Sequence, residues 1–467
     1  MVSEDILFLP VTELSRRIRT RQLSPVELAQ SYLERSRTLG PRLNAYATLT
    51  DQLALEQARA AEKEIAAAKY RGPLHGIPYA AKDLLAVKGY PTSWGARPFA
   101  NQKFDYDATV IRRLEAAGAV LIGKAAMIEL AGGMGYRYAS ASMTGPAKNP
   151  WNTDCWTCGS SSGSGAIVAA GLAAFAIGTE TWGSILCPSG FNGVSGLRPT
   201  FGRVSRHGAM ALAYSMDKIG PMCRSAEDCD LVLQAIAGHD AQDAGSLPDP
   251  AAQYSGVRKA TMPLRLGWMT NAWKEISPEV AGPVNEARKV LESEPSLVVK
   301  NVALPEGPWE AAAGVTVSVE GATAFRSLIQ SGQVAQLNDP LGKIGGYMNE
   351  EISASDYMVA QRIRSILQKK MDEIFQQVDV LVAAALPVTA TRLDANLDDA
   401  LSFPDPIGGI GNFCGLPAIS VPCGFAKNNL PAGLQFVGRP LGDAQAVHAA
   451  KLFQSRTNWH KQRPRLT

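Results

Sequence analysis

Residues 158–188 contain the densest group of side chains that could carry out covalent chemistry. Residues 158–165 read Cys-Gly-Ser-Ser-Ser-Gly-Ser-Gly, and after an apolar segment residues 179–188 read Thr-Glu-Thr-Trp-Gly-Ser-Ile-Leu-Cys-Pro. A run of serine and glycine lets the backbone turn tightly around a small polar group, and a serine hydroxyl becomes a nucleophile when a base takes its proton. The two segments together indicate a catalytic centre built on a serine.

One serine of the first segment fits a common arrangement for a nucleophile. Residues 159–163 match the pattern G-x-S-x-G with Ser161 at its centre, and this pattern requires an apolar strand that leads directly into the turn. The preceding residues 149–157 read Asn-Pro-Trp-Asn-Thr-Asp-Cys-Trp-Thr, with proline and polar residues where the strand should lie. The pattern therefore does not single out Ser161.

A serine nucleophile also needs a base, and histidine is the usual one. The chain has five histidines, His75, His207, His239, His448 and His460. None is tied to the serine cluster by its spacing, and we interpret His207, the nearest, as structural or as part of a rim. A lysine can replace histidine when burial leaves it neutral. Lys82 follows the short apolar run 77–81, so it is either such a base or a side chain that extends to the surface.

The apolar pattern predicts the elements that must position these groups. Residues 1–70 have the pattern of a helical N-terminal layer, 71–225 carry the chemistry, and 226–467 continue an α/β pattern. Strands are predicted at 77–81, 119–123, 264–269, 297–302, 380–385, 418–422 and 433–437, and helices at 56–68, 107–117, 166–177, 226–237, 280–293, 309–331, 355–377 and 443–453. We expect one large domain, 1–467. Residues 338–346 are too rich in glycine to predict packed structure, so we interpret 338–350 as a possible flap.

Composition narrows the classes of partner. The chain has 467 residues, with 46 basic and 43 acidic side chains and a net charge of +3. So small a net charge favours a small or neutral ligand and argues against nucleic acid or a membrane surface. The N-terminus does not resemble a signal peptide, and no stretch reaches the roughly 18 apolar residues of a spanning helix. We therefore expect a cytoplasmic protein.

The seven cysteines have irregular spacings, which favours reduced, buried thiols over a disulfide framework. Cys155 and Cys158 form a CxxC pair, but no second pair and no suitably spaced histidine accompany it. We therefore predict no metal site.

Four blocks in order resemble the signature of a known family. They are residues 76–83 (Gly-Ile-Pro-Tyr-Ala-Ala-Lys-Asp), 159–165, 178–188 and 193–200 (Gly-Val-Ser-Gly-Leu-Arg-Pro-Thr), supported by 107–110, 149–151 and 415–422. With these blocks the chain resembles the amidase signature enzymes from about residue 10 to about residue 460. The resemblance implies an α/β fold with a central mixed β-sheet that helices cover on both faces.

The resemblance also implies roles for individual residues. Lys82 matches the catalytic lysine of the family, Ser160 the bridging serine on a cis peptide bond, and Ser184 the nucleophile. The oxyanion hole would be made of the backbone N–H groups of Thr181, Trp182, Gly183 and Ser184. The loop 132–138 resembles a substrate-lining segment, whose candidates are Met134, Gly135, Tyr136 and Tyr138. No metal or organic cofactor is implied.

Two positions depart from the family pattern. The family usually has glycine where this chain has Trp182, and arginine where it has Leu186. Because that arginine pairs with an acid equivalent to Glu180, we expect Glu180 to find another partner, become protonated or sit in water. Trp182 either lines the pocket or points away from it while its N–H still serves.

These features predict a serine hydrolase that cleaves amide C–N bonds of small neutral or aromatic substrates through an acyl-enzyme on Ser184. Carbamates (urethanes) and esters are further expected substrates, because the same attack applies to any such carbonyl. One alternative is the glutamine-hydrolysing subunit of a tRNA-dependent amidotransferase, which residues 196–206 and 215–221 also resemble. The other is a non-catalytic scaffold of the same fold. The sequence leaves the oligomeric state open.

Overall fold

A computed structural model describes residues 2–257 and 263–466 as an α/β fold around one large mixed sheet. The eleven strands lie in the order β1-β3-β2-β6-β8-β7-β12-β13-β11-β9-β10. Their bounds are β1 Tyr46–Leu49, β2 Pro78–Lys82, β3 Val120–Ala125, β6 Phe175–Glu180, β7 Ser195–Arg198, β8 Lys218–Cys223, β9 Leu264–Met269, β10 Leu297–Val302, β11 Val380–Ala384, β12 Ala418–Phe425 and β13 Pro431–Gly438. β2 runs parallel to β3 and β6, β9 runs parallel to β10 and β11, and the other neighbours are antiparallel.

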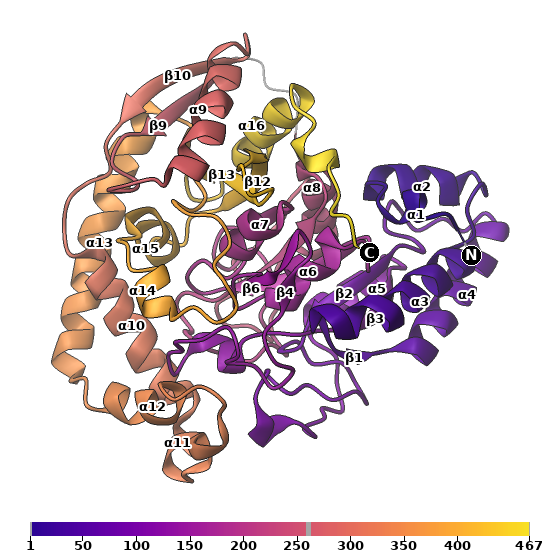
Figure 1. The fold of residues 1–467 in the computed structure, drawn as a ribbon, viewed down its shortest axis with the longest axis horizontal. Coiled ribbons are helices and arrows are strands. Elements are labelled where there is room, and N and C mark those ends of the chain that lie inside the picture. Colours follow the sequence, from indigo (N-terminus) through magenta and orange to yellow (C-terminus); the bar gives the residue numbers. More distant parts are fainter. Residues whose placement is uncertain (1, 258–262, 467) are drawn as a thin grey trace.

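Helices surround this sheet (Figure 1). Their bounds are α1 Glu4–Leu7, α2 Val11–Arg19, α3 Pro25–Leu43, α4 Asp51–Ala66, α5 Thr109–Ala116, α6 Ser162–Ala169, α7 Leu186–Asn192, α8 Ala226–Ile236, α9 Pro278–Glu292, α10 Trp309–Ala324, α11 Arg326–Gln330, α12 Gly342–Glu350, α13 Ala354–Gln377, α14 Leu397–Ala400, α15 Pro406–Phe413 and α16 Asp443–Ser455, with 3-10 turns at Arg97–Phe99, Glu129–Gly132, Gln333–Gln336 and Trp459–Lys461. A separate hairpin pairs β4 Lys148–Asn149 with β5 Asn152–Trp156. The helices α1 to α4 lie at one end of the molecule, and β9 and β10 lie at the other (Figure 1).

Strand β8 illustrates how helices cover both faces of the sheet. Successive side chains of a strand point to opposite faces. The sulfur of Met222 lies beside Gly178, next to Ser161 and Ile185 at the starts of α6 and α7, whereas the next residue, Cys223, contacts Cys229 of α8. The α6–α7 pair therefore covers one face and α8 the other, and the predicted mixed sheet with two covered faces is confirmed.

Three expectations about local structure are wrong. The N-terminal layer is not entirely helical, because Tyr46–Leu49 forms the edge strand β1. The helix expected over 166–177 ends at Ala169, and the chain enters β6 at Phe175. The glycine-rich segment is packed: 342–350 forms α12, and Gly345 lies against the backbone of Met134. That this segment moves as a flap stays a prediction.

One buried hydrophobic cluster extends from Leu7 to Phe453 and includes side chains from the N-terminal helices, the sheet and α16. This continuity supports the expectation of a single domain. Among the described residues, no helix has both the length and the apolar composition needed to span a bilayer.

Candidate active site

Lys82 lies at the carboxyl end of β2, between β3 and β6, and is completely buried. The whole strand is buried, as expected for a central parallel strand between two helical layers, so the amine cannot reach water. Lys82 Nζ lies 2.7 Å from Ser160 Oγ and 2.9 Å from Thr179 Oγ1. The sequence therefore places a lysine in the core, and the fold brings a serine to it.

The environment of Lys82 favours its neutral form. Burial lowers the pKa of Lys82 to about 7, although the carboxylates of Asp217 and Glu180 act in the opposite direction. A neutral amine has a lone pair that can accept the proton of the Ser160 hydroxyl. Lys82 thus has the properties that a base at neutral pH requires.

Ser160 lies in the turn between β5 and α6. The Gly159–Ser160 peptide bond is cis, the geometry that the family resemblance implies. The Ser160 carbonyl accepts a hydrogen bond from the N–H of Ile128 at 3.2 Å, and the residue is 1% exposed. Ser160 is therefore fixed by its backbone while its hydroxyl faces Lys82.

Ser161 is held in a different role. Its hydroxyl donates to the carbonyl of Thr179 at 3.1 Å and accepts from the N–H of the same residue at 3.2 Å, and the side chain is completely buried. A strand does precede the serine cluster, contrary to expectation, but it is β5 of the separate hairpin. Ser161 joins the start of α6 to β6, and its hydroxyl is already occupied.

Ser184 lies in the turn between β6 and α7, directly after Gly183, whose φ of 82° is in the region that favours glycine. Ser184 is 8% exposed and so is the most accessible of the three expected catalytic residues. In the part of the chain that the structure describes, its hydroxyl makes no hydrogen bond. Catalytic hydrogen bonds often tighten only when substrate binds, so this geometry is compatible with a role as nucleophile.

The segment before Ser184 presents backbone donors. Within residues 2–257 and 263–466, the N–H groups of 181–184 have no hydrogen-bond acceptor. The segment is anchored by a side chain instead, because Thr181 Oγ1 donates to Asp217 Oδ1 at 2.5 Å. The carboxylate of Asp217 also accepts from the backbone of Leu212 at 2.8 Å. Sequence reasoning missed Asp217, although it stands within the block 215–221 that resembles the family.

Glu180 has found a partner that the sequence did not identify. Its Oε1 accepts from Arg198 Nη1 at 2.6 Å, and its Oε2 accepts from the backbone of Ile185 and Leu186 at 2.8 and 2.9 Å. Burial by itself would raise the pKa of Glu180, but Arg198, Lys218 and the N–H of Leu186 outweigh burial and hold the pKa below its usual value. Glu180 is therefore a charged anchor for the backbone that follows Ser184.

Comparison with known proteins assigns the chain to a family. A sequence profile of the family described as Amidase matches residues 27–447. The chain belongs to the amidase signature family. Among the relatives of this amidase, a glutamyl-tRNA(Gln) amidotransferase subunit from Moorella thermoacetica is 36% identical over 494 positions, which cover 99% of each chain.

Solved structures support the same assignment. This amidase matches the peptide amidase from Stenotrophomonas maltophilia with a TM-score of 0.84 and 30% identity, over 96% of this chain and 97% of that one. A bacterial aryl acylamidase of the amidase signature family matches with a TM-score of 0.85 over 98% of this chain and 99% of that one. Its identity of 23% shows the shared fold alone.

Trp182, one of the two departures from the family pattern, is directed towards α15. Its indole Nε1 donates to Asp405 Oδ2 at 3.0 Å, and its ring lies against Gly409. Burial raises the pKa of Asp405 to about 7, and the nearby carboxylate of Glu310 adds to the effect. In this amidase, an indole and a carboxyl group therefore occupy the space beside the nucleophile that a glycine would leave open.

The expected substrate-lining residues have separate surroundings. Met134 is buried against Gly346 of α12, and Tyr136 packs edge-on against Trp156 with the ring centroids 6.1 Å apart. Gly135 has a φ of 78°, and Tyr138 is 36% exposed. Whether these residues contact substrate stays a prediction.

The expectation that this amidase has only reduced thiols is wrong. Cys158 and Cys187 form a disulfide with their Cα atoms 5.9 Å apart, and Cys155 stays free. Cys158 stands two positions before Ser160, and Cys187 stands three positions after Ser184. The bridge therefore joins the two segments that carry the serines.

Proposed function

We propose that this amidase-family hydrolase acts without partner subunits on small neutral or aromatic amides, with Ser184 as the nucleophile, Ser160 as the relay and Lys82 as the base. The observation that carries the proposal is the 2.7 Å contact between the buried amine of Lys82 and Ser160 Oγ. A lysine of low pKa in contact with a serine has the chemistry of a general base.

The proposed reaction moves one proton along these three residues. Ser184 Oγ attacks the carbonyl carbon while its proton passes to Ser160, whose own proton passes to Lys82. When the C–N bond breaks, the same path returns the proton to the nitrogen, which leaves as a neutral amine. Water then attacks the ester on Ser184 by the same route and releases the acid.

The N–H groups of 181–184 would stabilise the negative charge that develops on the carbonyl oxygen. One such donor typically contributes about 3 kcal/mol to the transition state. The contacts of Thr181 with Asp217 and of Glu180 with the backbone of Ile185 fix both ends of this segment, so the donors are held in place before substrate arrives. Carbamates and esters present the same carbonyl and are included in the proposal.

A second candidate rests on sequence similarity. The amidotransferase subunit of Moorella thermoacetica matches the whole length of this chain, so a glutamine-hydrolysing subunit is the alternative. Trp182 argues against it, because the indole uses the carboxyl group of Asp405 in a position where the family usually has glycine.

The test uses the purified chain without tRNA, ATP or other subunits. We expect hydrolysis of acetanilide and of simple carbamates or esters, and loss of all of it in Ser184→Ala. Activity that appears only with glutamine and a partner complex would favour the alternative. Equal rates in the wild type and in Ser184→Ala would favour a non-catalytic scaffold with a contaminating hydrolase.

A further inference from the structure

A cavity of about 340 Å³ lies beside Lys82, at the carboxyl ends of β2 and β6. Its walls are mainly apolar and include Leu84, Ala131, Ala209, Met210, Leu212 and Ile219. This volume is at the lower end of the range for small-molecule sites, which are typically about 300–1,000 Å³. The cavity therefore has room for a single ring or a short aliphatic group.

The polar side chains in its inner wall are already engaged. Asp217 accepts from Thr181 and from the backbone of Leu212 and Ala213, and Lys218 Nζ donates to the carbonyl of Met216. Because these groups already have hydrogen-bond partners, the cavity offers an apolar group contact without leaving a buried polar atom unpaired.

Lys82 separates this cavity from the serines. On one side its amine contacts Ser160, and on the other it contacts Thr179 Oγ1 at 2.9 Å. Thr179 and Thr181 are themselves part of the cavity wall. The cavity thus adjoins the end of the proton path that returns a proton to the leaving nitrogen.

From this arrangement we infer that the cavity binds the amine half of the substrate, and that the enzyme is selective for amides of aryl or other apolar amines. The inference rests on the proposed function. The leaving nitrogen must approach Ser160 to receive its proton when the C–N bond breaks. Its substituent therefore lies on the Lys82 side of the carbonyl, where the apolar cavity begins.

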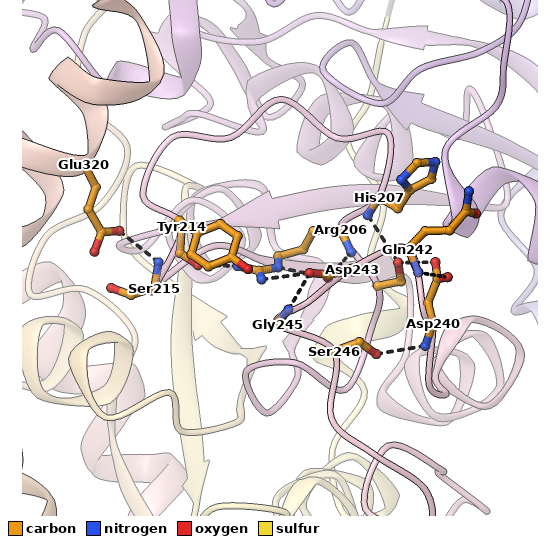
Figure 2. Close-up of polar contacts among 11 residues, drawn as sticks. Arg206, His207, Tyr214, Ser215, Asp240, Gln242, Asp243, Gly245, Ser246 and Glu320 are labelled. Carbon is orange, nitrogen blue, oxygen red and sulfur yellow. Dashed lines mark hydrogen bonds and ion pairs between the residues drawn. The ribbon is translucent and has the colours of Figure 1, made fainter.

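The outer rim of the cavity is polar and firmly held (Figure 2). Arg206 is paired with Asp243 at 3.0 Å and lies over the rings of Phe201 and Tyr214, with its guanidinium carbon 4.8 and 4.7 Å from their centroids. Tyr214 is 56% exposed, and Gln242 at the rim is also exposed. A ring in the cavity could therefore carry a polar substituent directed towards water.

The test compares two substrates that share an acetyl group, acetamide and acetanilide. We expect Ala209→Phe, which fills the cavity, to lower kcat/KM for acetanilide about 10-fold or more and for acetamide less than about 3-fold, since lost pocket contacts are typically worth about 10–200-fold. Met210→Ala, which widens the cavity, should raise the kcat/KM of N-(1-naphthyl)acetamide relative to acetanilide. Ala235→Leu on α8, outside the cavity wall, controls for the general cost of a larger side chain.

Several results would overturn the inference. If Ala209→Phe lowered both substrates equally, or changed the ratio of benzamide to acetamide instead, the cavity would not hold the amine half. If the wild type cleaved acetamide but not acetanilide, the inference would fail while the proposed function stood. Absence of hydrolysis of every amide would overturn both.

Discussion

The low pKa of Lys82 makes hydrolysis pH-dependent in a predictable direction. Burial lowers this pKa from 10.5 to about 7, which corresponds to about 5 kcal/mol against the protonated amine in its site. Only the neutral amine can accept a proton, and its fraction rises with pH. At pH 5 about 1% of the lysines would be neutral, so kcat/KM should lie about 100-fold below its alkaline plateau.

The assay measures kcat/KM for acetanilide from pH 5 to pH 9, with circular dichroism at each pH to show that the fold persists. We expect a slope of about one in log kcat/KM below pH 7, with the midpoint near pH 7. Lys82→Arg, which keeps a positive charge but cannot release it, should be inactive throughout. A flat profile down to pH 5, or full activity in Lys82→Arg, would refute the role of Lys82 as base.

Two further predictions concern stability. Replacing Cys158 and Cys187 by serine should lower the free energy of unfolding by about 3–4 kcal/mol in denaturant titrations, because the bridge constrains a loop with a sequence separation of 29; Cys155→Ser, a neighbouring free thiol, is the control, and an equal loss there would contradict this prediction. Arg198→Met should cost about 3–5 kcal/mol at pH 7, because it leaves Glu180 buried without its cation. That cost should shrink below about pH 5, where Glu180 can be protonated, and a cost independent of pH would contradict the ion-pair account.

The parts of the fold that the sequence predicted are those with a strong local signal. The buried run before Lys82 became β2, and 264–269 became β9, because continuous apolar runs bounded by turns are typical of strands buried on both faces. β1 was missed because Tyr46–Leu49 is a short, half-buried edge strand between two helices. The boundary within 166–177 was missed because apolar helix and apolar strand have no distinguishing period there.

The candidate site was predictable only as far as residue types and family blocks extend. The contact between Lys82 and Ser160 follows from the resemblance, and the structure brings the two together over 78 positions of sequence. The partner of Glu180 was not predictable, since Arg198 reaches it across the sheet from β7. Likewise no spacing rule pairs Cys158 with Cys187, because their distance depends on how the two turns meet in the folded chain.

The identity of the nucleophile can be tested directly by covalent labelling. The purified protein would be treated with a serine-reactive phosphonate and its adduct located by peptide mass spectrometry. We expect one adduct, on Ser184, its absence in Ser184→Ala, and its persistence in Ser161→Ala, because the Ser161 hydroxyl is buried and engaged with the backbone of Thr179. An adduct on Ser161, or labelling that survives Ser184→Ala, would contradict the account.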